Sequence, residues 1–234
     1  MIVQVTCPEQ LSPLPEKGLE VQKIRALYLA YGTGYDFCRF YRQDNSFLSL
    51  LDGSAVLCDD VSTDYEEWSR FIIMSGCREL FCSEDAAVAL MKIGGFRCDT
   101  VNLMRFEGAA HTEPTENAPA LSDVYSIIRE GFDIEFEPWY LDMSHRVRHG
   151  ITQCRILDGK AALVIQHDLN GEALLSQVAS LHEYRGEGYA SRLVRAVSTE
   201  LAPSKVYIIC EDGLVGFYEK CGYSISGRKC VLFP

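Results

Sequence analysis

Short sequence patterns recur in the same order in the two halves of this 234-residue chain, and this recurrence restricts the fold more than any other feature. LDGSAVL at 51–57 matches LDGKAAL at 157–163, and LMKIGGF at 90–96 matches FYEKCGY at 217–223. The first pattern predicts two strands joined by a D-G hairpin turn. The second predicts a helix that ends at glycine and leads into a strand. The two matches together favour an internal duplication. Their offsets, 106 and 127 residues, predict about 21 additional residues between these landmarks in the C-terminal half.

A segment of small and polar residues with two prolines, EGAAHTEPTENAPA at 107–120, separates the halves and is typical of a linker. We therefore expect one domain at 1–106 and another at 121–234. Hydrophobic spacing in the second domain predicts two helices, with Ser122 as the N-cap of the first, and then strands alternating with further helices. The predicted strands lie at 153–157, 161–166, 174–181, 205–210 and 224–233. This order predicts an α/β layered domain with a mixed sheet.

A glycine-containing stretch, YRGEGYASRLV at 184–194, lies between a predicted strand and a predicted helix. The first N–H groups of a helix lack partners within the helix, and they lie at the positive end of its dipole. Gly186 and Gly188 would let a diphosphate approach the backbone, and Ala190 keeps the next turn small. The dinucleotide motif would have glycine at Ser191, and no Walker G-K-[ST] follows. From these residues alone, a phosphate loop and an ordinary strand-to-helix turn both stay open.

Composition excludes several functional classes. The 22 basic and 33 acidic residues give a net charge of −11, which argues against a nucleic acid or a membrane surface as partner. The N-terminus has no signal-peptide pattern, and no apolar run approaches the length of a membrane span. The ten cysteines form no C-x-x-C pair, which favours reduced thiols in a cytoplasmic protein. His145 and His149 are spaced as metal ligands, but no third ligand is evident, so we expect no metal.

The sequence QVASLHEYRGEGYASRLV at 177–194 resembles the acetyl-CoA-binding motif of the GNAT N-acetyltransferase superfamily, R/Q-x-x-G-x-G/A. The downstream FYEKCGY resembles the FYEKLGF of that family. The resemblance covers about 121–234 and implies a mixed, mostly antiparallel sheet flanked by helices. Together with the duplication, it implies two tandem related domains: a degenerate GNAT-like domain at 1–106 and a catalytic one at 121–234. His182 stands where the family often has proline, and Glu211 stands where it often has asparagine.

The resemblance also implies roles for individual residues. Gln177–Leu181 would splay from Lys205–Cys210 and admit the pantetheine arm of acetyl-CoA, and the 185–191 loop would hold the pyrophosphate. Tyr218 matches the family tyrosine that protonates the departing CoA thiolate. The expected cofactor-binding residues are Val178, Ala179, Ser180, Arg185, Gly186, Glu187, Gly188, Tyr189, Ala190 and Ser191. The candidate acceptor contacts are Trp139, Tyr140, Asp142 and Arg146. Neither the resemblance nor the sequence names a general base, and Glu172, Glu135 and His182 are the open candidates.

We therefore expect an acetyl-CoA-dependent N-acetyltransferase that transfers the acetyl group directly to a small-molecule or peptide amine. A non-catalytic acyl-CoA-binding or regulatory module is the alternative. The N-terminal half has Met91 at the position of Tyr218 and lacks the glycine loop. We expect that half to bind no CoA, and either to cover the acceptor side of the catalytic domain or to form a homodimer.

Overall fold

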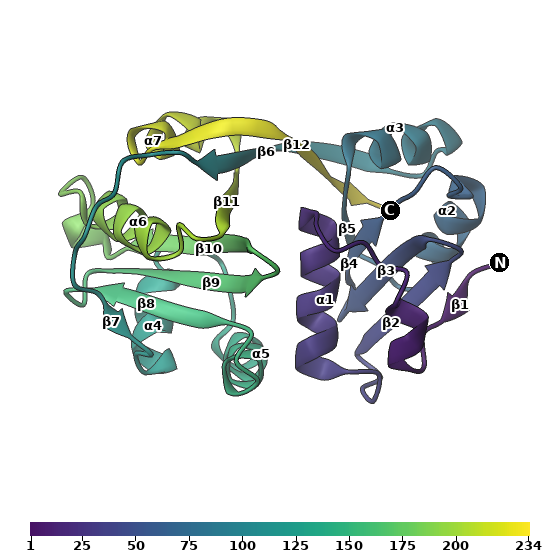
Figure 1. The fold of residues 1–234 in the computed structure, drawn as a ribbon, viewed down its shortest axis with the longest axis horizontal. Coiled ribbons are helices and arrows are strands. Elements are labelled where there is room, and N and C mark those ends of the chain that lie inside the picture. Colours follow the sequence, from purple (N-terminus) through teal and green to yellow (C-terminus); the bar gives the residue numbers. More distant parts are fainter. The chain divides into compact units, whose positions relative to one another are not determined.

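The computed structural model describes residues 1–234 and divides into two compact units. Unit 1 comprises Met1–Val101 and Arg228–Pro234, and unit 2 comprises Asn102–Gly227. Each unit contains one mixed sheet flanked by helices, which confirms the predicted fold class (Figure 1).

Unit 1 has the strand order β1-β2-β3-β4-β5-β12, in which only β4 and β5 are parallel. Its elements are β1 (Val3–Gln4), α1 (Leu19–Tyr31), β2 (Cys38–Gln43), β3 (Ser46–Leu51), β4 (Ser54–Cys58), α2 (Tyr65–Met74), β5 (Glu79–Cys82), α3 (Glu84–Ile93) and the end of β12 (Tyr223–Phe233).

Unit 2 has the strand order β12-β6-β11-β10-β9-β8-β7, and β10 runs parallel to β11 (Figure 1). Its elements are β6 (Arg97–Phe106), β7 (Glu116–Asn117), α4 (Leu121–Ile128), α5 (Phe136–Arg148), β8 (Gln153–Leu157), β9 (Ala161–Leu169), β10 (Glu172–Ser180), the 3₁₀ turn η2 (His182–Tyr184), α6 (Tyr189–Glu200), β11 (Lys205–Cys210), α7 (Val215–Lys220) and the start of β12. The first helix has Ala120 rather than Ser122 as its N-cap, because the Ser122 hydroxyl contacts Asp123 and caps no backbone N–H.

The two units repeat one topology, because β1 to β5 follow the same order and directions as β7 to β11. The two halves of the sequence align differently from our expectation. LDGSAVL joins β3 to β4, and its counterpart in unit 2 is LNGEALL at 169–175, which joins β9 to β10. LDGKAAL joins β8 to β9 instead. The corrected offset is 118 residues, so the C-terminal half has 9 additional residues before the second landmark, not 21.

The incorrect match has a physical cause in the turns. Asp52, Asp158 and Asn170 all have positive φ values and are each followed by a glycine with positive φ. These are the requirements of a type I′ hairpin turn. The same short motif therefore recurs at hairpins that are not equivalent.

Strands β6 and β12 each contribute residues to both units. The end of β6 pairs with β11 in unit 2, from Arg105↔Tyr207 to Asn102↔Cys210. The end of β12 pairs with β5 in unit 1, from Cys230↔Cys82 to Leu232↔Leu80. The compact units therefore differ from the continuous segments 1–106 and 121–234. The expected linker at 107–120 also carries β7, and its Glu113 binds Arg192 on α6.

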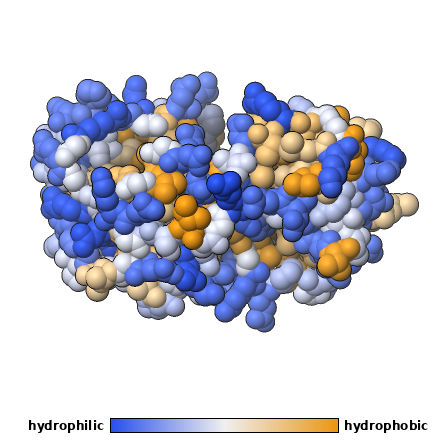
Figure 2. All heavy atoms as spheres, turned by 90° about the horizontal axis from the view of Figure 1, so that it is seen from above, coloured by the Kyte–Doolittle hydropathy of each residue, from blue (hydrophilic) through white to orange (hydrophobic).

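Helices cover both faces of the unit 2 sheet. One buried cluster joins the sheet to α6 and α7 through Leu193, Val197 and Tyr218. A second cluster joins the opposite face to α4 and α5 through Ile128 and Trp139. The face of the molecule in Figure 2 is largely hydrophilic, with hydrophobic side chains in smaller groups. No helix combines the length and apolar character that crossing a membrane requires.

Candidate functional site

Strands β10 and β11 separate after four paired residues. Their parallel pairing runs from Glu172↔Lys205 to Leu175↔Ile208 and then stops, although β10 continues to Ser180. A β-bulge shifts the pairing of β10 with β9 between Ser176 and Ala179. The second half of β10, which contains the predicted contacts Val178, Ala179 and Ser180, therefore has no strand paired on its β11 side. An extended ligand could add to this edge as another strand would.

The bulge is held by a partly buried hydrogen bond. Gln177 has a φ of 49°, which is uncommon for a residue other than glycine. Its side-chain oxygen accepts a hydrogen bond of 3.0 Å from Trp139 Nε1 on α5. Trp139 is only 7% exposed and packs in the cluster beneath α4 and α5. Trp139, expected to contact the acceptor, is thus a buried residue whose N–H is used to fix the bulge. The sequence carries no signal for the unusual conformation of Gln177.

The predicted phosphate loop presents unpaired backbone donors. The N–H of Arg185 donates to His182 and that of Glu187 donates to Tyr184, so both are used within the turn. The N–H groups of five neighbours have no acceptor in the protein; these are Gly186, Gly188, Tyr189, Ala190 and Ser191. Four of them lie at the N-terminus of α6, where the helix dipole favours an anion.

Both loop glycines have a conformation that favours glycine. Gly186 has a φ of +85°, and Gly188, the N-cap of α6, has a φ of +86°. A Cβ on Gly186 would meet no protein atom within 4 Å, so open space lies beside the loop. The loop is tied to the neighbouring helix pair, because Arg185 Nη2 donates to the carbonyl oxygen of Glu130 beyond the end of α4. Arg185 therefore has a structural contact in addition to its predicted role.

Tyr218 lies on α7 in the same buried cluster as the core face of α6. It is 6% exposed, and Val178 and Tyr189 pack against the same cluster. Tyr218, Val178 of β10 and Tyr189 of the loop therefore contribute to one cluster on the α6 and α7 side of the sheet. Burial, reinforced by Cys210 and Cys221, raises the pKa of the Tyr218 hydroxyl above its usual value. The hydroxyl makes no hydrogen bond within the protein, so its proton is available to a bound group.

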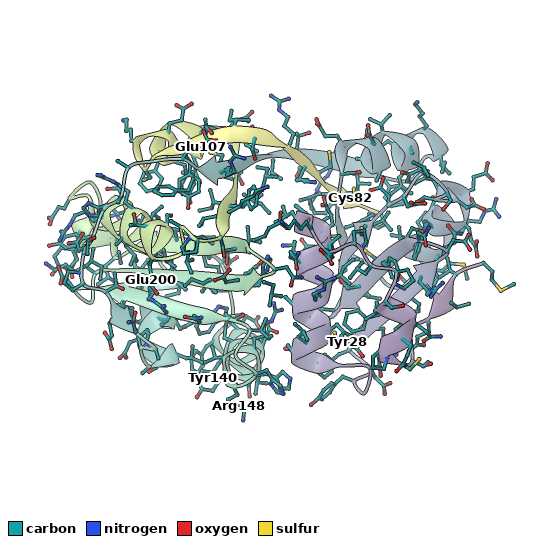
Figure 3. All side chains as sticks on the ribbon, in the orientation of Figure 1. Tyr28, Cys82, Glu107, Tyr140, Arg148 and Glu200 are labelled. Atoms are coloured by element: carbon teal, nitrogen blue, oxygen red, sulfur yellow. The ribbon has the colours of Figure 1, made fainter.

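The other candidate acceptor contacts lie along α5 and mostly contact one another. Asp142 and Arg146 form an ion pair at 2.7 Å, one helical turn apart. Tyr140 is 40% exposed and packs against the ring of Phe136, and it extends from α5 together with Arg148 (Figure 3). Their role in acceptor binding stays a prediction.

The structure does not single out a general base. Glu172 is buried at the start of β10, at the opposite end of the strand from Ser180. His182 lies in η2, directly before the loop, and Glu135 is the exposed N-cap residue of α5. His145 and His149 stack with their ring centroids 4.2 Å apart.

In unit 1, carboxylates occupy the position that the loop has in unit 2. The segment between β4 and α2, CDDVSTD at 58–64, contains no glycine. Asp64 accepts a hydrogen bond from the N–H of Glu67, and Asp60 accepts hydrogen bonds from Ser62. Because these carboxylates already lie at the N-terminus of α2, a phosphate there would meet negative charge. Met91, at the position of Tyr218, is 46% exposed on α3.

Comparisons with known proteins address the family and the fold of the chain. Residues 124–223 match the family model described as "Acetyltransferase (GNAT) family", which spans α4 to the start of β12. No curated protein sequence matches the chain.

Solved structures resemble the chain in fold at low sequence identity. A Drosophila protein solved by a structural genomics consortium has a TM-score of 0.67 at 11% identity, covering 100% of this chain and 98% of that one. A tandem GNAT protein from the clavulanic acid biosynthesis pathway has a TM-score of 0.58 at 11% identity and the same coverage. A GCN5-related N-acetyltransferase from Kribbella flavida has a TM-score of 0.59 at 15% identity, covering 80% of this chain and 86% of that one. The likeness to a tandem GNAT protein extends over both units.

Proposed function

Because residues 124–223 match the acetyltransferase (GNAT) family model, we propose that this chain is an acetyl-CoA-dependent N-acetyltransferase that transfers the acetyl group directly to a primary amine. The family supports acetyltransferase activity in general. The observation that carries the specific proposal is the row of five unpaired N–H groups at Gly186 and the N-terminus of α6, adjoining the open edge of β10.

The residues present fit acetyl-CoA in two respects. The unpaired N–H groups and the positive end of α6 suit the two phosphates of its pyrophosphate. The unpaired edge of Val178, Ala179 and Ser180 suits the amides of its pantetheine arm, because both partners carry backbone-like donors and acceptors. Acetyl-CoA supplies a thioester whose carbonyl carbon accepts a nucleophile.

In the proposed reaction, the neutral amine attacks the thioester carbonyl carbon, the new C–N bond forms and the C–S bond breaks. A backbone N–H of β10 would donate to the carbonyl oxygen as negative charge develops there. The thiolate leaves with the electron pair of the C–S bond and takes the proton of the Tyr218 hydroxyl. The amine gives up its proton to a base or to water, since only an unprotonated amine is a nucleophile.

Tyr218 suits the role of acid because burial keeps it protonated. A raised pKa means that the hydroxyl keeps its proton through neutral pH and loses it only above the usual range of tyrosine. An alkaline loss of activity below about pH 10 would therefore come from a group other than Tyr218.

Substitution of Tyr218 by phenylalanine tests its role. We expect Tyr218→Phe to lower turnover about 10²-fold or more, within the range for general acid catalysis, with acetyl-CoA affinity nearly unchanged. Thiol release from acetyl-CoA with a panel of amines measures turnover, and calorimetry measures binding. Tyr223→Phe is the matched control, because Tyr223 is a buried neighbour whose hydroxyl bonds Ser198 at 2.6 Å. An unchanged rate in Tyr218→Phe would remove the tyrosine from the mechanism.

Acetyl-CoA binding by the unaltered protein without thiol release for any amine would instead support the non-catalytic module.

A further inference from the structure

Three basic side chains surround the loop in unit 2, and two of them, Arg185 and Lys160, form no ion pair with a carboxylate. Arg185 donates to the carbonyl oxygen of Glu130, and Arg192 forms an ion pair with Glu113. Lys160 forms no ion pair with a carboxylate. Asp158, in the same turn, acts on Lys160 electrostatically without forming an ion pair with it. In a chain with a net charge of −11, this ammonium group beside an anion-binding loop can attract an anionic ligand.

Lys160 is held in place by aromatic rings. Its Nζ lies 4.6 Å from the ring centroid of Tyr184 and 4.5 Å from that of Tyr189, and it donates to the Tyr189 hydroxyl at 2.7 Å. Its carbonyl oxygen accepts a hydrogen bond from the N–H of Leu181, which fixes the β8–β9 turn beside the end of β10. Aromatic faces stabilise an ammonium ion without neutralising it, and one hydrogen bond leaves two further donors on Nζ.

We propose that Lys160 binds the 3′-phosphate of coenzyme A, and that it thereby distinguishes the coenzyme from its 3′-dephospho form. This inference rests on the proposed function. The unpaired N–H groups of the loop suffice for the pyrophosphate, so the remaining phosphate of the coenzyme needs another partner. Lys160 binds the outer end of the Tyr189 side chain, and the backbone N–H of Tyr189 belongs to the loop donors. The ammonium group therefore lies beside the pyrophosphate cradle but outside it.

The unit without a phosphate loop also lacks this lysine. The turn between β2 and β3 is the unit 1 counterpart of the β8–β9 turn, and it consists of Asp44 and Asn45. The Lys160 side chain and the glycine loop thus occur together in unit 2, and unit 1 lacks both. Two parts of one binding site would show this pattern.

Calorimetric titration of the full chain with coenzyme A and with 3′-dephospho-coenzyme A tests the proposal. We expect the unaltered protein to bind coenzyme A about fivefold to tenfold more tightly, the size of a partly exposed charged contact. Lys160→Met should lose this preference while binding the dephospho form as the unaltered protein does. Lys160→Arg should keep part of it. Lys205→Met, at the exposed start of β11, is the control and should keep all of it.

The outcomes separate this proposal from the proposed function. If Lys160→Met keeps the preference, or loses affinity equally for both ligands, Lys160 does not bind the 3′-phosphate, although the coenzyme site stands. If the unaltered protein binds neither ligand, the proposed function fails, and the assignment of Lys160 fails with it.

Discussion

At the residue scale, Gly186 and Gly188 shape the backbone of the loop, and we propose that they also give a ligand access to it. Their positive φ values turn the chain from β10 into α6, and their missing Cβ atoms leave the surrounding N–H groups accessible. A side chain at either position would impose backbone strain, and at Gly186 it would also enter the open space that a ligand needs.

These two effects can be separated by comparing Gly186→Ala with Gly150→Ala. Gly150 follows α5 with a φ of +70°, and a Cβ there also meets no atom within 4 Å. Both substitutions should lower the free energy of unfolding by about 1 kcal/mol, because each places alanine in the left-handed region. Only Gly186→Ala should weaken acetyl-CoA binding, by tenfold or more. Denaturant unfolding and calorimetry measure the two quantities, and equal affinities in both variants would contradict the loop assignment.

Local chemistry made part of the proposed site recognisable in the sequence. Gly186, Gly188 and Tyr218 stand out because motif and spacing define them. Gln177 and Lys160 do not, since a bulge and a pair of tyrosine rings around a lysine arise only when β8, β9, β10 and α6 pack together. Likewise, Ser122 has the chemistry of an N-cap, but α4 begins one residue before it.

At the element scale, the bulge in β10 connects helix α5 to the open edge of that strand. Trp139 on α5 holds Gln177 at the point where β10 leaves β11, so α5 fixes the shape of the open edge through one hydrogen bond. A change in this bond should alter coenzyme binding without touching the loop.

The two tryptophans of the chain provide a matched test of this role. Both are buried, and each indole N–H donates at 3.0 Å: Trp139 to Gln177 in unit 2, and Trp68 to Ser46 in unit 1. Trp139→Phe and Trp68→Phe should each lower stability by about 1–3 kcal/mol, from the lost bond and the lost volume. Only Trp139→Phe should raise the KM for acetyl-CoA. A similar KM increase in both variants would mean that the effect is general destabilisation.

The elements themselves were largely predictable, and their pairing was less so. The predicted strands at 153–157 and 205–210 coincide with β8 and β11, because alternation and flanking turns define them locally. The match of LDGSAVL with LDGKAAL was wrong because three hairpins share one turn chemistry. Strand order, which local sequence does not encode, decides which hairpins correspond.

At the scale of the whole molecule, neither half of the sequence contains a complete sheet. β6 belongs to the N-terminal half of the chain, but its end lies beside β11 in unit 2, where Met104 is fully buried. We expected a continuous domain at 121–234, and the compact unit is 102–227. The two differ at the N-terminal end because the end of β6 belongs to unit 2. Sequence periodicity identifies β6 as a strand without showing which sheet receives it.

Truncation should expose this dependence. A fragment of residues 107–234 lacks β6, so the edge of β11 and the apolar cluster around Met104 would be open to solvent. We expect that fragment to aggregate or to unfold without cooperativity, because an unpaired apolar strand edge templates association. A fragment of residues 97–227 keeps β6 to β11 and the start of β12, which is the unit 2 part of that strand, and should unfold cooperatively. Circular dichroism with thermal melting distinguishes them, and a cooperative melt for residues 107–234 would contradict the role of β6.

One unit has a glycine loop with unpaired N–H groups and the other has carboxylates at the corresponding position, so we propose that the whole chain has a single coenzyme site. The segment Asp59–Asp64 places carboxylates where unit 2 has free N–H groups, and unit 1 should therefore bind no acetyl-CoA. Native mass spectrometry of the full chain with excess acetyl-CoA measures the stoichiometry directly. One bound acetyl-CoA per chain, lost in Gly188→Trp, is the predicted result. Two bound molecules, or none, would contradict the account.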